Sequence, residues 1–559
     1  MAQEFQLKGV TTLDLKDGEK REVEVEGVED GKVLLVQMGN KTHAIGANCT
    51  HYGAPLKNGV LTPDGRLTCP WHGACFNVNS GDVEDAPALD PIATFELTEK
   101  NGGIYIKGDE QTIKAKRRTA KFGGTRGCAA VAEESVIVVG GGSGTMGTVQ
   151  SLLEHSYKGT ITILSKESYL PIDRTKLSKS LMTDVSKLAL RPQEWFDESN
   201  VKVISEAVSS IDFSKKEVST STGKSYPYTK LVLATGGTPK MLPLPGFKEL
   251  KNVFLLRTVS DAEGIVKAVG EDKCKKIVVV GSSFIGMEVA NCLAKDNTIT
   301  VIGMEKAPME RVMGEEVGKI FQSQLSKNGV KFQMEAGVEK AAPHPDDPSR
   351  VGAVHLKGGT VLEADLVILG VGVAPATEYI KENKAINLEK DGSLRVNEKF
   401  EVLGHEDSVY AIGDIATYPY HGPGAESSGT PIRIEHWNVA QNSGRSVGSA
   451  IASVYSSSKH EAPKPFIPVF WSALGSQLRY CGATPGGYDD YVIKGQPEEG
   501  KFAAYYGKKG EIVAVASMGM DPVMTKSAEL MRRKGMPSLK EIKDGVDVLT
   551  LNVPKEIKI

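Results

Sequence analysis

The sequence has few cysteines, few aromatic residues and no long apolar run. Seven cysteines in 559 residues are too few, and odd in number, for a disulfide framework, which favours a reducing compartment. No uncharged apolar stretch reaches the roughly 18 residues of a membrane-spanning helix, so no membrane span is predicted. The 67 basic and 70 acidic residues nearly cancel, which gives no reason to expect a nucleic-acid partner.

The first twenty residues, MAQEFQLKGVTTLDLKDGEK, also lack two familiar targeting patterns. They contain no apolar segment like that of a secretory signal, and they are not the acid-poor, arginine-rich segment of a transit peptide. We therefore expect a cytoplasmic protein, with a mitochondrial location as the alternative.

The length exceeds what one hydrophobic core supports, and the composition changes along the chain. Residues 1–107 contain short alternating runs such as REVEVEGV, which predict a small all-β domain. Residues 108–134 are polar and basic, and they predict a linker that holds the first domain near the rest and lets it swing. Residues 456–559 mix strands with a charged helix, and they predict an α+β C-terminal domain.

Four metal-ligating side chains stand in two short loops of the all-β domain. Cys49 and His51 form a Cys-x-His pair, and after seventeen intervening residues Cys69 and His72 form a Cys-x-x-His pair. Zinc sites of two cysteines and two histidines usually take both cysteines from one loop, whereas here each loop supplies one of each. This interleaving favours a [2Fe–2S] cluster with two thiolates on one iron and two imidazoles on the other, and zinc is the alternative.

The loops CTHYGA and CPWHGACF resemble those of the Rieske [2Fe–2S] domain. High-potential members of that family carry an extra cysteine in each loop, joined in a disulfide, and Ser and Tyr donors to the cluster, whereas the corresponding stretches here contain Ala54, Ala74 and Phe76. Fewer donors to the cluster lower its potential, so the resemblance implies a low-potential, ferredoxin-type cluster.

Beyond residue 134 the pattern changes to buried strand, glycine turn and helix. The segment SVIVVGGGSG places Gly140 at a tight turn and Gly142 where a backbone can approach a pyrophosphate, which predicts an FAD site. Thr235 and Gly236, in LVLATGGTP, belong to a pattern that recurs in flavoproteins with two nucleotide domains. Asp414, after another strand, is expected to bind the ribityl chain of FAD.

A second glycine turn, KIVVVGSSFIG, predicts an NAD site at Gly281, Ser283 and Gly286. Glu305 follows the next strand, where a carboxylate binds the adenosine ribose and repels a 2′-phosphate. We therefore expect NADH rather than NADPH, although Lys306 and Arg311 lie close in the sequence and act in the opposite sense.

The order of these motifs predicts how the two nucleotide domains are connected. The FAD turn precedes the NAD turn, and the Gly-Asp motif of the FAD domain follows both. We expect an FAD domain built from residues 135–255 and 387–455, with an NAD domain inserted at 256–386. Continuous Val and Ile runs that end in glycine indicate two doubly wound α/β, Rossmann-type domains.

Three further segments carry a family resemblance. YLPIDRTKLSK (169–179), IRIEHWNVAQ (432–441) and VFWSALG (469–475) resemble the apoptosis-inducing-factor-like flavoproteins and the ferredoxin reductases of ring-hydroxylating oxygenases. Together with the N-terminal loops, they resemble the Rieske-containing apoptosis-inducing-factor-3-like oxidoreductases and their fungal relatives.

This resemblance implies roles for several residues. Arg174 is expected at the FAD pyrophosphate, and Lys179 beside the flavin N5, paired with Glu288 as a catalytic pair. A surface ion pair is the alternative for the last two. The aromatic residues expected at the flavin, with core packing as the alternative for each, are His436, Trp437 and Trp471.

The sequence has no C-x-x-C or C-x-x-x-x-C pair, which flavoprotein disulfide reductases need. Electrons from NADH are therefore expected to pass through FAD to the fused cluster, and from there to an unknown protein or small-molecule acceptor. Two alternatives stay open: direct reduction of a quinone by the flavin with the cluster domain as a redox sensor, or an NADH-responsive signalling protein. A homodimer is left open as well.

Overall fold

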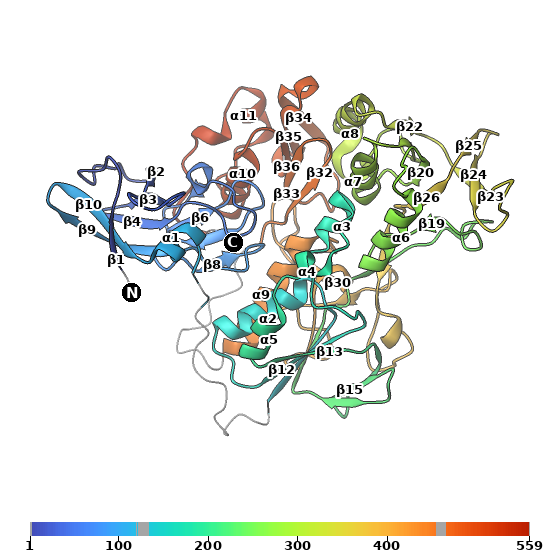
Figure 1. The fold of residues 1–559 in the computed structure, drawn as a ribbon, viewed down its shortest axis with the longest axis horizontal. Helices are drawn as coiled ribbons and strands as arrows, with labels where there is room; N and C mark the ends of the chain where they lie inside the picture. Colours follow the sequence, from blue (N-terminus) through green and yellow to red (C-terminus); the bar gives the residue numbers. More distant parts are fainter. Residues whose placement is uncertain (1–2, 119, 121–133, 454–465, 558–559) are drawn as a thin grey trace.

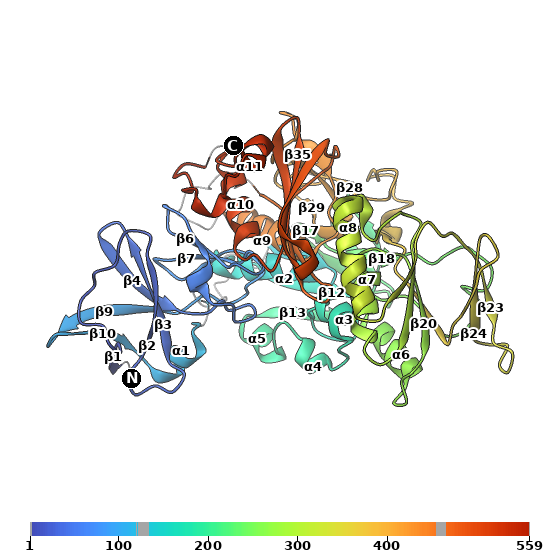
Figure 2. The same ribbon diagram turned by 90° about the horizontal axis from the view of Figure 1, so that it is seen from above.

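The computed structural model describes residues 3–118, 120, 134–453 and 466–557. The N-terminal domain lies at one end of the long axis of the molecule, and the nucleotide domain that contains β20 lies at the other end (Figure 1). A second nucleotide domain and the C-terminal domain lie between these ends, as the second view also shows (Figure 2). Within the described ranges, no helix is long and apolar enough to cross a membrane.

The N-terminal domain consists of two antiparallel sheets, as the alternating sequence predicted. The larger sheet has the order β1 (Gln3–Gln6), β10 (Gly103–Gly108), β9 (Thr94–Lys100), β4 (Lys41–Gly46), β3 (Lys32–Met38) and β2 (Lys20–Glu24). The smaller sheet has the order β5 (Val60–Leu61), β6 (Arg66–Thr68), β7 (Cys75–Asn77) and β8 (Val83–Asp85). Strand β3 separates two cores, because its alternate side chains point to opposite faces. Leu34 packs with the cluster loops, and Leu35 packs on the other side.

The packed part of this domain extends beyond the predicted start of the linker at residue 108. Asp109 caps the start of helix α1 (Glu110–Ala115), because its side chain accepts a hydrogen bond from the Thr112 amide. Ile113 is fully buried in the core with Leu35, and this one apolar anchor fixes a segment that is otherwise charged. Linker residues 119 and 121–133 lie outside the described residues.

The FAD domain has a parallel sheet in the order β13 (Val201–Ser205), β12 (Thr160–Ser165), β11 (Ser135–Val139), β17 (Lys230–Leu233) and β29 (Val409–Ala411). Helices α2 (Ser143–Glu154) and α9 (Trp437–Ala452) pack on one face of it. The two helices approach closely through glycines, since a Cβ on Gly147 would lie 2.1 Å from the Gln441 carbonyl oxygen. This close packing of the two helices accounts for Gly147, which the cofactor is not needed to explain.

The NAD domain repeats this plan. Its parallel sheet has the order β19 (Val253–Phe254), β26 (Leu366–Leu369), β20 (Lys276–Val280), β21 (Thr298–Ile302) and β22 (Lys331–Gln333). Its helices are α6 (Val259–Val269), α7 (Phe284–Leu293) and α8 (Glu310–Lys327). The sheet begins just before residue 256, where the insertion is predicted to start, and the domain boundaries themselves stay predictions. Two short strands, β18 (Gly237–Pro239) and β27 (Val373–Pro375), join the two nucleotide domains.

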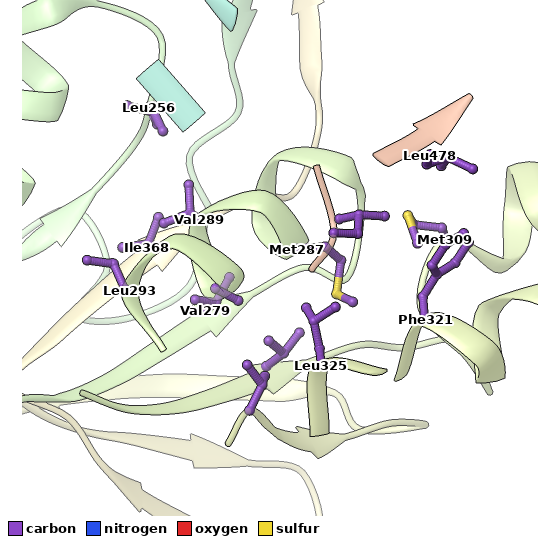
Figure 3. Close-up of a cluster of buried hydrophobic side chains, with 14 of the residues drawn as sticks. Leu256, Val279, Met287, Val289, Leu293, Met309, Phe321, Leu325, Ile368 and Leu478 are labelled. Carbon is purple, nitrogen blue, oxygen red and sulfur yellow. The ribbon is translucent and has the colours of Figure 1, made fainter. Parts of the chain in front are cut away.

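The C-terminal domain is α+β, as predicted. Its antiparallel sheet has the order β32 (Val469–Ala473), β33 (Gln477–Gly482), β36 (Glu511–Met518), β35 (Lys501–Lys508) and β34 (Asp490–Gln496). Helices α10 (Val523–Arg532) and α11 (Leu539–Lys543) follow. One face of the sheet shares a core with the NAD domain, where Leu478 packs near Met309 and Phe321 (Figure 3). The other face shares a core with Val60 of the N-terminal domain. The C-terminal sheet therefore joins the cluster domain to the nucleotide domains.

Candidate cluster and flavin sites

The two cluster loops have the same local conformation. In each loop the cysteine amide donates to an alanine carbonyl, from Cys49 to Ala54 and from Cys69 to Ala74, both at 2.8 Å. Each loop also turns through a glycine of positive φ, which a side chain would strain. The repeated turn presents one cysteine and one histidine from each loop on the same side.

The structure brings the four predicted ligands together. His51 Nδ1 and His72 Nδ1 are 3.1 Å apart, and Cys49 and Cys69 are both buried in the same core cluster of this domain. Burial lowers the pKa of His51 to about 4, so its imidazole is neutral and keeps a lone pair for a metal. Among the described residues, no three Cys, His, Asp or Glu side chains are arranged to hold a single metal ion. The close approach of the two imidazoles is the arrangement that a [2Fe–2S] cluster with both histidines on one iron requires.

Aromatic rings surround the two histidines. The Tyr52 ring stacks on His51 with 3.8 Å between centroids, and its hydroxyl donates to Asp173. The Trp471 ring packs against His72, with 4.4 Å between centroids. Trp471 is buried and belongs to β32 of the C-terminal domain, so a ring from another domain covers a proposed ligand.

The first glycine turn has the shape of a pyrophosphate cradle. Gly140 adopts a φ of 118°, and a Cβ there would lie 2.3 Å from the Ala234 carbonyl oxygen, so only glycine fits. Gly142 precedes α2, and a Cβ on it would meet no atom within 4 Å. No side chain caps the start of α2, which leaves its first N–H groups for an anion in the open space at Gly142. These residues fit FAD.

Arg257 joins the other predicted flavin residues, and sequence reasoning missed it. Its Nη2 donates to Asp414 at 3.0 Å, and its carbonyl oxygen accepts a hydrogen bond of 3.0 Å from Arg174. A Cβ on Gly236 would lie 2.5 Å from the same Nη2. One sequence signal could have pointed to Arg257. A capping box starts α6 directly after it and fixes the position of Arg257 at the entry to the helix. The Thr235 hydroxyl donates instead to the Ala376 carbonyl, at 2.7 Å.

Lys179 and Glu288 form an ion pair of 2.9 Å between α3 (Thr175–Ser180) and α7. Glu288 is 4% exposed, which argues against the alternative of a surface ion pair. Its carboxylate also accepts hydrogen bonds from the hydroxyls of Ser178 and Ser472, the latter at 2.6 Å. Three domains thus hold one buried carboxylate, which needs such partners to remain charged.

His436 lies near this ion pair, and its ring centroid is 5.1 Å from that of Trp471. Burial and the nearby Lys179 cation lower the pKa of His436 to about 3, so the imidazole is neutral. Trp437, the first residue of α9, follows directly and is partly exposed. The structure therefore brings His436 and Trp471 together with the Lys179–Glu288 pair.

The second glycine turn repeats the geometry of the first. Gly281 has a φ of 106°, and a Cβ there would lie 2.3 Å from the Gly370 carbonyl oxygen. The Ser283 hydroxyl donates to the same carbonyl at 2.8 Å, so the serine that replaces the middle glycine points back at the protein. Glu305 follows β21 and pairs with Arg311 at 2.8 Å.

Family models match each part of the chain. The pyridine nucleotide-disulphide oxidoreductase model matches residues 134–444, the Rieske [2Fe-2S] domain model residues 7–96, and the reductase C-terminal model residues 469–550. The fold and its sites define a flavin- and nicotinamide-dependent oxidoreductase with a fused Rieske domain. The chain belongs to the pyridine nucleotide-disulphide oxidoreductase family, and its cofactors are FAD, NADH and a [2Fe–2S] cluster.

Named relatives agree with this assignment. Apoptosis-inducing factor 3 of Homo sapiens is 37% identical over a match that covers 93% of this chain and 82% of the relative. Rhodocoxin reductase of Rhodococcus erythropolis is 30% identical and is matched over 66% of this chain and 83% of its own. The solved covalent putidaredoxin reductase–putidaredoxin complex has a TM-score of 0.64 at 26% identity, covering 72% of this chain and 93% of that chain. The resemblance to Rieske-containing apoptosis-inducing-factor-3-like proteins and to ferredoxin reductases is confirmed.

Proposed function

We propose that this NADH-dependent oxidoreductase passes electrons through FAD to its own Rieske cluster and then to a one-electron acceptor. The observation that carries the proposal is the contact between Trp471 and His72, whose ring centroids are 4.4 Å apart. Trp471 also lies beside His436 in the proposed flavin site, and His72 is a proposed cluster ligand. A single buried ring therefore joins the two redox sites.

The residues of the chain have separate tasks in this proposal. When bound, FAD takes up two electrons with a hydride and can release them singly, and the cluster carries one electron at a time. Lys179 places a cation where the reduced ring is electron-rich, and Glu288 holds that ammonium in position. Trp471 covers His72 and excludes water between the two sites.

The cluster domain is fastened in this position by hydrogen bonds to α9. The Ala86 amide donates to Asn442 and the Ala86 carbonyl accepts from Asn438, both at 2.9 Å. Arg445 donates to the Val83 carbonyl at 2.7 Å. These contacts support electron transfer from the flavin to the cluster while the cluster domain stays docked. This step does not need the domain movement that the linker would permit.

An anaerobic NADH titration of the purified protein, followed by absorbance and EPR, tests the proposal. We expect the flavin to bleach and a rhombic Rieske signal to appear in proportion. A flavin that is reduced while the cluster stays oxidised would refute the internal electron path and favour direct reduction of an acceptor by the flavin.

Replacing Lys179 with methionine is expected to slow flavin reduction by NADH about 10- to 100-fold. The reason is the loss of a charge-assisted interaction worth about 1.5–3 kcal/mol. Stopped-flow absorbance of the flavin measures this rate. Lys187→Met is the control, because Lys187 is well exposed on α4 (Val185–Leu188) and is expected to leave the rate unchanged. Equal rates in both variants would remove Lys179 from its proposed role.

Replacing Glu305 with glutamine is expected to reduce the preference for NADH over NADPH by about tenfold or more. The glutamine no longer repels a 2′-phosphate. Like charges in close contact weaken binding by a free energy of the order of several kcal/mol. It also frees Arg311, now 2.8 Å from Glu305, to bind that phosphate. The ratio of kcat/KM values for the two nucleotides measures the effect, with Glu316→Gln on the exposed side of α8 as the control. A wild-type preference for NADPH would contradict the role given to Glu305.

A further inference from the structure

A buried arginine of the C-terminal domain lies beside the cluster site of the N-terminal domain. Strands β32 and β33 are antiparallel neighbours, and Arg479 stands directly opposite Trp471 in their register. Residues opposite each other in such a pair project from the same face of the sheet. Since Trp471 packs on His72, Arg479 also faces the cluster loops.

Helix α10 brings a second contact to the same place. The Thr525 hydroxyl lies 3.3 Å from the carbonyl oxygens of Cys69 and Pro70, in the second cluster loop. Asp521, just before α10, lies 3.5 Å from Arg479. Arg479 is thus placed at the cluster site from two directions, by its register opposite Trp471 on β32 and by Asp521 just before α10. The C-terminal domain thus holds a cation next to one thiolate ligand and one imidazole ligand.

The charge of Arg479 is only partly compensated by its neighbours. The residue is 3% exposed, and its Nη1 donates to the Gln477 side chain at 3.1 Å. Its buried Nε forms an ion pair with Asp521 at 3.5 Å, which is too long for a short, charge-assisted hydrogen bond. Arginine stays protonated in proteins, so this position keeps a positive charge in a poorly solvated place.

We propose that Arg479 raises the reduction potential of the Rieske cluster when the N-terminal domain is docked. The proposal deepens the proposed function and rests on it. One-electron reduction adds one negative charge to the cluster, and a nearby cation in a poorly solvated site stabilises the more negative state. The electron comes from the flavin, so Arg479 makes that transfer more favourable.

A reciprocal effect on docking follows from thermodynamic linkage. If docking beside Arg479 favours the reduced cluster by some factor, reduction strengthens docking by the same factor. The oxidised and reduced forms of the chain therefore differ in how tightly the cluster domain is held. The cation belongs to one domain and the cluster to another, so the isolated cluster domain lacks this contribution.

A dye-mediated redox titration of the full chain, followed by the EPR signal of the cluster, tests the proposal. Arg479→Met is expected to disfavour cluster reduction by about tenfold, which corresponds to a midpoint about 59 mV lower for a one-electron couple. Arg479→Lys is expected to restore most of this loss, because it retains the charge. Asp521→Asn, which removes the opposing charge, is expected to shift the midpoint upward.

Each possible result of these titrations either supports or overturns the proposal. An unchanged midpoint in Arg479→Met with an intact EPR signal would overturn the proposal, as would shifts of the same sign in Arg479→Met and Asp521→Asn. If Arg479→Met fails to fold, the absence of an upward shift in Asp521→Asn overturns it. The mediators reduce the cluster without NADH or flavin, so failure of the internal electron path would appear separately, in the NADH titration.

Discussion

Replacing Cys69 with serine is expected to abolish the Rieske EPR signal and to reduce NADH-driven reduction of one-electron acceptors by about 100-fold or more. Loss of a residue that merely supports a metal ligand already costs about 10- to 100-fold in affinity or activity, so loss of the ligand should cost more. Flavin reduction by NADH should continue, because Lys179 and Glu288 belong to other domains. EPR and iron content measure the cluster, steady-state turnover with a one-electron acceptor measures the second effect, and stopped-flow flavin absorbance measures the third.

Cys75→Ser is the matched control for this substitution. Cys75 is also fully buried in the cluster domain, six residues further along the chain, and burial raises the pKa of its thiol to about 12. It pairs with Thr68 across β6 and β7, and it is not one of the four proposed ligands. We expect this variant to keep its cluster. Full acceptor turnover in Cys69→Ser would instead support direct reduction by the flavin, with the Rieske domain as a redox sensor.

Replacing Arg533 with methionine is expected to loosen the docked cluster domain and to cost about 3–5 kcal/mol of stability. Arg533 is fully buried, and its Nη2 pairs with Asp64 of the cluster domain at 2.8 Å. It also donates to the carbonyls of Pro554 and Lys555. Its Nε lies 3.8 Å from the buried Glu529, whose own carboxylate accepts a hydrogen bond from Thr68. The methionine side chain fills part of the space, but it leaves the buried negative charge of Glu529 without the positive charge of Arg533.

Two measurements separate loss of docking from general unfolding. Stopped-flow absorbance and rapid-freeze EPR of Arg533→Met should show slower cluster reduction with an unchanged rate of flavin reduction. Denaturant unfolding gives the free-energy cost. Arg21→Met is the control, because Arg21 pairs with Asp14 and Glu19 at the surface and exposed ion pairs contribute little. Wild-type cluster reduction in Arg533→Met would show that this network does not hold the two domains together.

The local motifs were predictable from the sequence because each depends on residues close together in the chain. Cys49 and His51, like Cys69 and His72, sit within tight turns that their own neighbours enforce. Gly140 and Gly281 each stand between a buried strand and a helix, which is a local pattern, although the carbonyls that exclude a Cβ there belong to the distant residues Ala234 and Gly370. The order of these motifs sufficed to predict the domain types and the cofactors.

The interface between the domains was not predictable in this way. Arg257 and Asp414 lie 157 positions apart, and Thr68 and Glu529 lie 461 apart, so no short pattern relates them. The sequence also predicted that the linker starts at residue 108. A single apolar residue, Ile113, in a polar segment does not indicate that the segment packs on the domain. Nothing in the sequence around Arg479 marks it as a residue of the cluster site. Its place there depends on its register opposite Trp471.

The sequence by itself determined the cofactors and the order of the domain types, and it predicts a low-potential cluster. These features follow from ligand spacing, glycine turns and missing donors within short segments. Only the tertiary structure decided that Trp471 packs against both His72 and His436, that Ser472 donates a hydrogen bond to Glu288, and that Arg479 lies opposite Trp471. Their roles depend on which distant surfaces meet, because contacts and electric fields act through space and not along the chain.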